Sequence, residues 1–147
     1  MSSLKVGPVP DEYKKAVPEG LQGAIKELSY TVRNYINKSR RLVTTQNISN
    51  QEGGRETVQG EPIIKKCNIY LPAGYDENDK DSKYNVLYLL HGVGGNRYEW
   101  LYGSGQIDGN FVICTIVDHL IANGEIEPLI IVFPEGRSSY DWENNSF

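Results

Sequence analysis

A glycine-rich loop is the part of this sequence with the clearest capacity for chemistry. This glycine loop reads His91-Gly-Val-Gly-Gly95 and directly follows the apolar run 84–90. Its spacing fits neither of the glycine patterns that bind nucleotide phosphates, and no lysine follows to meet a phosphate. Glycine also lets a backbone N–H approach a reacting carbonyl closely, and such an N–H stabilises the negative charge that develops on the oxygen. The loop therefore favours an oxyanion-binding role over a nucleotide site.

Aromatic side chains follow the loop and are candidates for substrate binding. Tyr98 and Trp100, together with Tyr102, either line a pocket for an aromatic acyl group or pack in the core. Trp142 either contributes to the same site or covers part of the sheet. His91 is interpreted as a brace that holds the loop by hydrogen bonds, rather than as a catalytic base.

The printed sequence contains no recognisable serine nucleophile. A nucleophile elbow reads G-x-S-x-G, and no serine here has glycine both two residues before and two residues after it. In Tyr102-Gly-Ser-Gly-Gln106 the glycines adjoin the serine directly. Cys67 and Cys114 lack the C-x-x-C spacing of zinc or redox sites and lie among apolar residues. We therefore expect no metal, no cofactor and no complete catalytic triad in this sequence.

Two kinds of apolar pattern predict the elements that position the glycine loop. Alternating residues predict strands at 24–32, where one slip suggests a bulge, and at 63–71. Continuous apolar runs at 84–90 and 129–133 predict central strands that are covered on both faces. Apolar residues spaced by three and four predict an amphipathic helix over 111–123.

Together these elements predict an α/β architecture with a mixed sheet and helices on its faces. We expect the first two strands to pair antiparallel at one edge. The strands at 84–90 and 129–133 should run parallel, because a helix between them makes a crossover unit that packs on one face of the sheet.

Composition limits both size and partners. The 147 residues allow one domain, preceded by an extended arm over 1–22 that carries three prolines. A net charge of −4 and a pI near 5.2 argue against nucleic acid as a partner. No apolar run approaches the roughly 18 residues of a membrane-spanning helix, so we expect no membrane partner.

Three motifs occur in a specific order along the chain. They are Ile69-Tyr-Leu-Pro-Ala-Gly-Tyr75, Val86-Leu-Tyr-Leu-Leu-His-Gly-Val-Gly-Gly95 and Pro128-Leu-Ile-Ile-Val-Phe-Pro-Glu-Gly-Arg137. Together they resemble the amino-terminal portion of the feruloyl esterase and esterase D-like group of α/β-hydrolases. The resemblance implies that residues 23–147 form the amino-terminal half of an α/β-hydrolase domain, incomplete in this chain.

The resemblance also implies a function. Members of this group are secreted carboxylic ester hydrolases that release ferulic or related hydroxycinnamic acids from plant cell-wall polysaccharide, with a Ser-His-Asp/Glu triad and no cofactor. The residue after His-Gly is the oxyanion donor in this pattern, which assigns the backbone N–H of Val93 to that role and places Gly92, Gly94 and Gly95 in the oxyanion loop. The triad would follow Phe147, because it comes after this loop in chain order. We expect the chain to be inactive alone and to be completed by the rest of the enzyme.

A second hypothesis is a non-catalytic carbohydrate-binding or interaction module derived from a hydrolase. If the sheet ended at 129–133, the outer edge of that strand would be unpaired. A stand-alone module usually protects such an edge with lysine or proline, and this strand carries neither. The sequence therefore favours an incomplete esterase over a stand-alone module.

Overall fold

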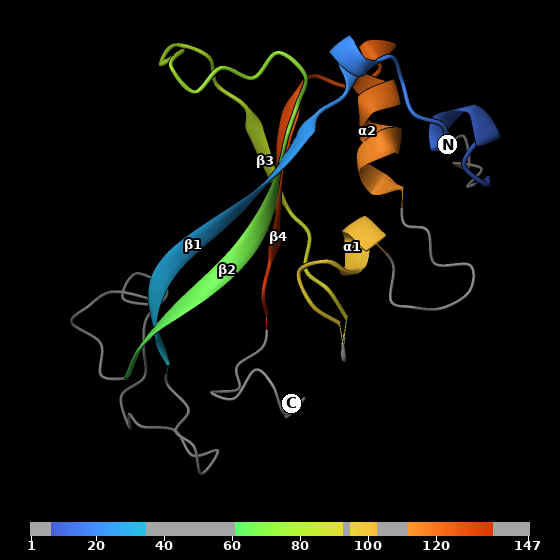
Figure 1. The fold of residues 1–147 in the computed structure, drawn as a ribbon. Coiled ribbons are helices and arrows are strands. Elements are labelled where there is room, and N and C mark those ends of the chain that lie inside the picture. Colours follow the sequence, from blue (N-terminus) through green and yellow to red (C-terminus); the bar gives the residue numbers. More distant parts are fainter. Residues whose placement is uncertain (1–6, 35–60, 93–94, 103–111, 137–147) are drawn as a thin grey trace, which may run out of the picture.

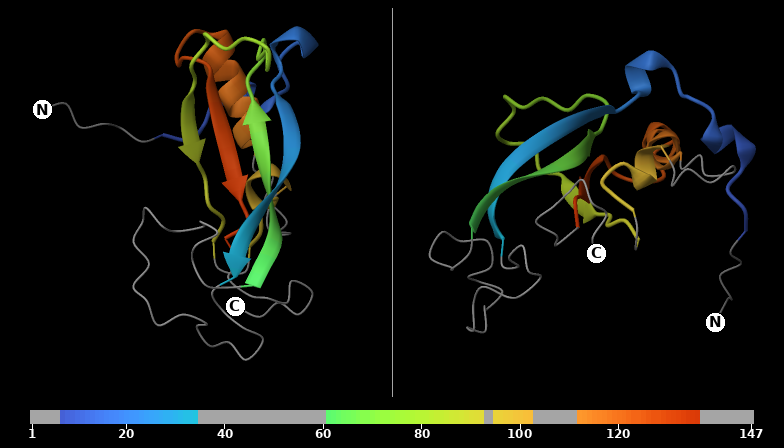
Figure 2. Two further views of the ribbon diagram at one scale, coloured as in Figure 1. Left: turned by 90° about the vertical axis from the view of Figure 1, so that its left-hand side faces the viewer. Right: turned by 60° about the horizontal axis from the view of Figure 1, so that its bottom comes forward.

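The computed structural model describes residues 7–34, 61–92, 95–102 and 112–136. They form a mixed four-stranded sheet in the order β1-β2-β4-β3, visible in Figure 1 and, side by side, in the left view of Figure 2. The strands are β1 (Ala24–Asn34), β2 (Glu61–Leu71), β3 (Asn85–Tyr88) and β4 (Leu129–Pro134). Because the sheet contains both antiparallel and parallel strand pairs, it confirms the predicted α/β architecture with a mixed sheet.

The strand pairs run as predicted, except that β1 carries no bulge. β1 and β2 pair antiparallel without interruption from Ala24 opposite Leu71 to Asn34 opposite Glu61. The slip in the apolar pattern has a simpler cause. Ile25 lies opposite the buried Tyr70, whereas Leu28 lies opposite Cys67, so this edge strand places apolar residues on both faces of the sheet.

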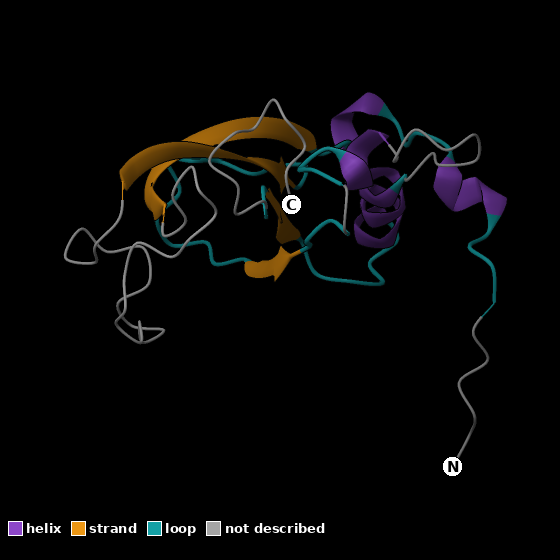
Figure 3. Ribbon diagram, turned by 90° about the horizontal axis from the view of Figure 1, so that it is seen from below, coloured by secondary structure: helices purple, strands orange, loops and turns teal. Residues whose placement is uncertain are grey.

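The two helices lie on one side of the sheet. α1 (Glu99–Tyr102) is a single turn, and α2 (Ile113–Ala122) lies within the predicted range 111–123. Figure 3 shows both helices beside the sheet, and α2 connects into β4, which runs parallel to β3. After α2 the chain turns at Gly124, whose φ of 69° lies in the left-handed region that favours glycine. The predicted strand–helix–strand unit is therefore confirmed.

The core lies between α2 and the middle of the sheet. Its buried members come from β2, β4 and α2: Tyr70, Val117, Ile131 and Phe133. Tyr70 pairs with Ile131 across the antiparallel β2–β4 ladder, so these two side chains share the face that α2 covers. β2 and β4, the interior strands, therefore supply the apolar surface on which α2 packs.

The prediction that the strand at 84–90 is covered on both faces is wrong for this chain. β3 is an edge strand, and Val86, Leu87 and Tyr88 are 49%, 45% and 65% exposed. Leu87 lies opposite Ile131, which packs in the core with Val117 of α2, so Val86 and Tyr88 lie on the other face of the sheet. The left view of Figure 2 shows α2 behind the sheet, on one face of it. The apolar run thus reflects a strand whose cover is not supplied by the described part of this chain.

The position expected for the strand at 129–133 also needs correction. β4 pairs with β2 on one side and β3 on the other, so neither of its edges is open. The edge strands of the described sheet are β1 and β3, and whereas β1 contains Lys26, Asn85-Val-Leu-Tyr88 contains neither lysine nor proline. The argument against a stand-alone module therefore applies to β3.

The amino-terminal arm packs along α2. Within its described part, two short 3₁₀ turns at Asp11–Lys14 and Glu19–Leu21 are joined by extended residues. His119 Nε2 on α2 donates to the Lys15 carbonyl at 2.7 Å. Gly23 N–H donates to Asp118 at 2.8 Å, where the arm enters β1. The arm is therefore attached to the same helix that supports the core.

Candidate functional site

The glycine loop and the segment after β4 lie next to each other, since β3 and β4 are parallel neighbours whose carboxyl ends share one edge of the sheet. The imidazole of His91 connects them. Its Nε2 accepts a hydrogen bond from Gly136 N–H at 3.0 Å, and its Nδ1 lies 2.8 Å from the Gly92 carbonyl. Because Nε2 accepts, Nδ1 carries the proton and donates to Gly92. This geometry fits the interpretation of His91 as a brace.

A buried carboxylate lies beside this connection. Glu135 Oε1 lies 3.4 Å from His91 Nε2, and both side chains are less than one tenth exposed. Glu135 Oε2 lies 3.8 Å from the Arg97 guanidinium, which belongs to the segment after the glycine loop. Glu135, the residue after β4, is thus linked electrostatically to Arg97, which follows the glycine loop.

Glu99 supports the glycine loop from the first turn of α1. Its Oε2 accepts a hydrogen bond from Gly92 N–H at 3.3 Å. The same carboxylate fills the space in front of Gly95, where an added Cβ would overlap it and lie 2.8 Å from its Cδ. Any other residue at position 95 would therefore displace the Glu99 carboxylate from this place. Sequence reasoning did not single out Glu99, because one glutamate after a glycine-rich loop forms no recognisable pattern.

Several predicted site residues lie outside the described residues. These are the proposed oxyanion donor Val93, its neighbour Gly94, and Trp142. Their assigned roles stay predictions. Gly92 and Gly95 are described, and their contacts with His91 and Glu99 fix the two ends of the loop.

The two aromatic candidates occupy different environments. Trp100 packs against the core, and its Nε1 donates to the Leu90 carbonyl at 2.8 Å, just before the loop. Tyr98 instead lines a cavity. Its ring stacks on Tyr102 with centroids 5.7 Å apart, and the Arg97 guanidinium lies 4.5 Å from the ring centroid. Tyr98 is therefore held by its neighbours on the cavity wall.

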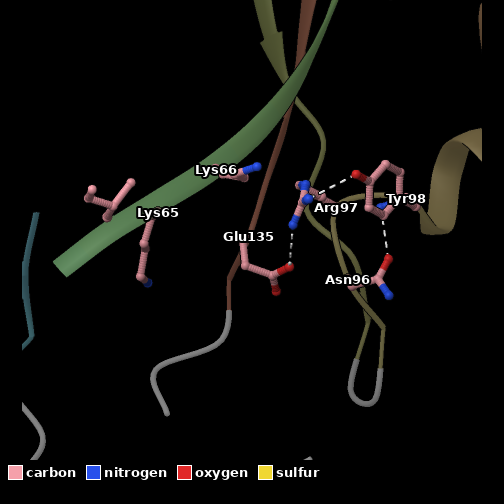
Figure 4. A pocket seen from close by; sticks show the side chains of 7 residues that line it. Lys65, Lys66, Asn96, Arg97, Tyr98 and Glu135 are labelled. Carbon is pink, nitrogen blue, oxygen red and sulfur yellow. Dashed lines mark hydrogen bonds and ion pairs between the residues drawn. The ribbon is translucent and has the colours of Figure 1, made fainter. Parts of the chain in front are cut away.

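This cavity, which we call the Arg97 cavity, lies between the start of β2 and the segment after the glycine loop (Figure 4). Its volume is about 370 Å³. Seven residues line it: Ile64, Lys65, Lys66, Asn96, Arg97, Tyr98 and Glu135. It thus borders the candidate oxyanion loop, and six of its seven lining residues are charged or polar.

The cysteines are poor nucleophiles in this fold. Burial raises the pKa of the Cys67 thiol, and burial next to Asp118 raises the pKa of Cys114 to about 12. Both therefore stay protonated and unreactive at neutral pH. Within the described residues no group of three or more His, Cys, Asp or Glu side chains is arranged to hold a metal ion, and no helix is long and apolar enough to cross a membrane.

Comparisons with known sequences extend this description. Endo-1,4-beta-xylanase Y of Acetivibrio thermocellus is 46% identical over 81 residues, which are 54% of this chain and 7% of that protein. The Endo-1,4-beta-xylanase/feruloyl esterase of Xylanibacter ruminicola is 39% identical over 78 residues, which are 52% of this chain and 10% of that protein. The chain thus spans a small part of each of these curated relatives.

A solved structure shares the fold. It is the feruloyl esterase module from Clostridium thermocellum, a serine-to-alanine mutant in complex with sinapinate, with a TM-score of 0.58 and 32% sequence identity. The match covers 90% of this chain and 33% of that one. The mixed sheet described above is therefore part of an α/β-hydrolase fold. A family model described as "Putative esterase" matches residues 64–146. Because this match covers more than half of the chain, the chain belongs to that esterase family.

Proposed function

We propose that this chain supplies the oxyanion loop of a serine carboxylesterase that releases ferulic or related hydroxycinnamic acids from plant cell-wall polysaccharide. The observation that carries the proposal is the support of the glycine loop. His91 ties one end to the segment after β4, and Glu99 holds Gly92 and fills the space at Gly95. A loop held at both ends suits a backbone donor that must keep one direction.

The chemistry that this loop would serve is acyl transfer. A serine oxygen attacks the ester carbonyl carbon, the carbonyl oxygen becomes an anion, and the alcohol of the polysaccharide leaves with a proton. The anion needs two N–H donors at about 2.7–3.1 Å. In this proposal Val93 provides one of them. The other follows the nucleophile, which with its histidine and carboxylate belongs to the part of the enzyme after Phe147.

The relatives support the substrate class. One curated relative carries feruloyl esterase in its name, and the solved module holds sinapinate after replacement of a serine by alanine. A plant cell-wall substrate lies outside the cell, so the proposal includes secretion of the enzyme.

The edge of the described sheet supports assembly with the rest of such an enzyme. β3 has one neighbour in the described sheet and exposes Val86 and Tyr88 on the face opposite α2. An apolar edge without lysine or proline is prone to pair with another strand. In this proposal the following part of the enzyme covers it, and the isolated 147-residue chain is inactive.

Two variants of the longer enzyme test the oxyanion assignment. Val93→Ala keeps the amide and should leave kcat for methyl ferulate within a few-fold of wild type. Gly94→Val restricts the backbone and should lower kcat by roughly 10²–10³, the usual cost of losing one oxyanion donor. Full activity of a normally folded Gly94→Val enzyme would contradict the assignment.

A separate experiment tests the need for the following part of the enzyme. A fluorophosphonate probe should label the longer enzyme and leave the isolated chain unlabelled. Stoichiometric labelling of the isolated chain at any serine would overturn that part of the proposal.

A further inference from the structure

Two neighbouring side chains of the sheet hold the segment that follows the glycine loop. Glu27 on β1 and Asn68 on β2 lie opposite each other in the antiparallel register, so both side chains are on the same face of the sheet. Asn68 Nδ2 donates to the main-chain carbonyl of Arg97 at 3.1 Å. Glu27 Oε2 accepts from the Arg97 guanidinium at 3.0 Å and from the Tyr98 hydroxyl at 3.2 Å. This cross-strand pair therefore holds both main-chain and side-chain groups of the segment.

The segment held in this way is continuous with the glycine loop and with α1. Asn96 directly follows Gly95, and its Oδ1 accepts from Tyr98 N–H at 2.9 Å (Figure 4). Its carbonyl accepts from Glu99 N–H at 3.0 Å, where α1 begins. Glu99 in turn accepts the hydrogen bond from Gly92 N–H and fills the space in front of Gly95. The position of this segment on the sheet therefore sets where Glu99 meets the loop.

The two anchors differ in strength. Asn68 is 2% exposed, so water cannot readily replace its hydrogen bond to the Arg97 carbonyl. The Glu27 side chain is 38% exposed, and ion pairs at such positions contribute little. The hydrogen bond from Lys66 lowers the pKa of Glu27, and the bond from Arg97 adds to this effect, so Glu27 is a carboxylate at neutral pH. We therefore expect Asn68 to be the main anchor and Glu27 the weaker one.

We infer that Asn68 and Glu27 are positioning residues for the glycine loop, which hold the segment after it and, through α1, keep the Val93 amide directed at the ester carbonyl oxygen. This inference rests on the proposed function, and in it neither side chain contacts the reacting atoms. The charge on that oxygen develops only in the transition state. A shift of the loop should therefore lower kcat and leave KM nearly unchanged.

Kinetics of the longer enzyme with methyl ferulate test the inference. Asn68→Ala and Asn68→Leu both remove the donor, but only Asn68→Leu keeps most of the side-chain volume, so a shared effect is that of the lost hydrogen bond. Each should lower kcat about tenfold, which is part of the roughly 10²–10³ lost with a whole oxyanion donor, with KM within about twofold of wild type. Glu27→Gln should lower kcat about threefold. Active sites are counted with a fluorophosphonate probe, so that an unfolded fraction does not lower the measured kcat.

A trifluoromethyl ketone analogue of methyl ferulate gives a second readout. The serine oxygen adds to its carbonyl carbon, the serine proton passes to the histidine of the triad, and the carbonyl oxygen becomes an anion like that of the reaction. The inhibition constant of this analogue should rise in each variant by the factor by which kcat falls. A role in stability alone would lower the unfolding free energy without this parallel.

Two matched controls separate positioning from stability. Tyr70→Phe removes a buried hydrogen bond to Asp118, and Tyr70 lies on the same strand and the same face as Asn68. Lys26→Gln removes an exposed ion pair of β1, one residue before Glu27. Both controls should keep the wild-type kcat and inhibition constant. Tyr70→Phe should nevertheless lower the unfolding free energy as the Asn68 variants do.

Several results would overturn the inference. They are a wild-type kcat and inhibition constant in folded Asn68 variants, a rise in KM with kcat unchanged, or an equal loss of kcat in the controls. If neither Asn68 variant folds, Glu27→Gln decides, since a lower kcat with unchanged KM supports the inference and wild-type kinetics overturn it. If the wild type itself does not hydrolyse methyl ferulate, the proposed function fails. If it does and the variants match it, only this inference fails.

Discussion

Replacing Gly95 with alanine tests how the glycine loop is held. The added Cβ would overlap the Glu99 carboxylate and lie 3.0 Å from the Cβ of His91. The glutamate is flexible and can move aside, but it then gives up the hydrogen bond from Gly92 N–H. One such bond contributes about 0.5–1.5 kcal/mol, which is the expected fall in unfolding free energy. Since full misalignment of an oxyanion donor costs roughly 10²–10³ in kcat, a partial shift of the loop should cost about tenfold.

The assay compares four proteins: wild type, Gly95→Ala, Glu99→Ala and the double variant, each in the longer enzyme. Denaturant unfolding and kcat for methyl ferulate are measured for all of them. If the glutamate is the main obstacle, Gly95→Ala should destabilise the wild type more than it destabilises the Glu99→Ala background, where only the 3.0 Å contact with the Cβ of His91 is left. Unchanged stability and unchanged kcat for Gly95→Ala alone would refute the reasoning.

Two further predictions concern side chains that connect segments. His91→Ala removes the hydrogen bonds to Gly92 and Gly136. It should lower kcat for methyl ferulate about tenfold or more and lower the unfolding free energy by about 1–3 kcal/mol. A kcat equal to that of the wild type would show that the loop does not need this brace. Asp118→Asn weakens the buried acceptor of Tyr70 O–H and Gly23 N–H, and it should lower unfolding free energy by about 1–3 kcal/mol with kcat unchanged. A stability equal to that of wild type in denaturant unfolding would contradict this role of Asp118.

Much of the fold was predictable because its signals are local. Alternation marked β2, the three-and-four spacing marked α2, and a glycine marked the end of α2, where a left-handed φ is required. The strand order was not predictable in the same way. The chain returns from α2 to insert β4 between β2 and β3, and this choice depends on packing between distant segments. The apolar run at 84–90 gave a wrong prediction for a related reason. Its composition is typical of a strand covered on both faces, and the described residues do not supply that cover.

The candidate site was likewise predictable only where its signal is local in the sequence. The glycine loop was recognisable because several glycines beside a buried-strand pattern are rare without a conformational purpose. Glu99 and the charged wall of the Arg97 cavity gave no such signal. Glu27, Lys66 and Arg97 are far apart in the sequence, and only the β1–β2 register and the return of the chain after β3 bring them together. Trp100 was correctly singled out as a residue near the loop, but whether it packs in the core or binds substrate depends on tertiary structure.

The most direct test of the central claim is a crystal structure of the longer enzyme with bound ferulate. The carboxylate of this product stands where the ester carbonyl stood, so one of its oxygens should lie about 2.7–3.1 Å from the Val93 amide nitrogen. His91 should still connect Gly92 and Gly136 in that complex. A ferulate carboxylate bound away from the Val93 amide, with the glycine loop in the same position, would contradict the account.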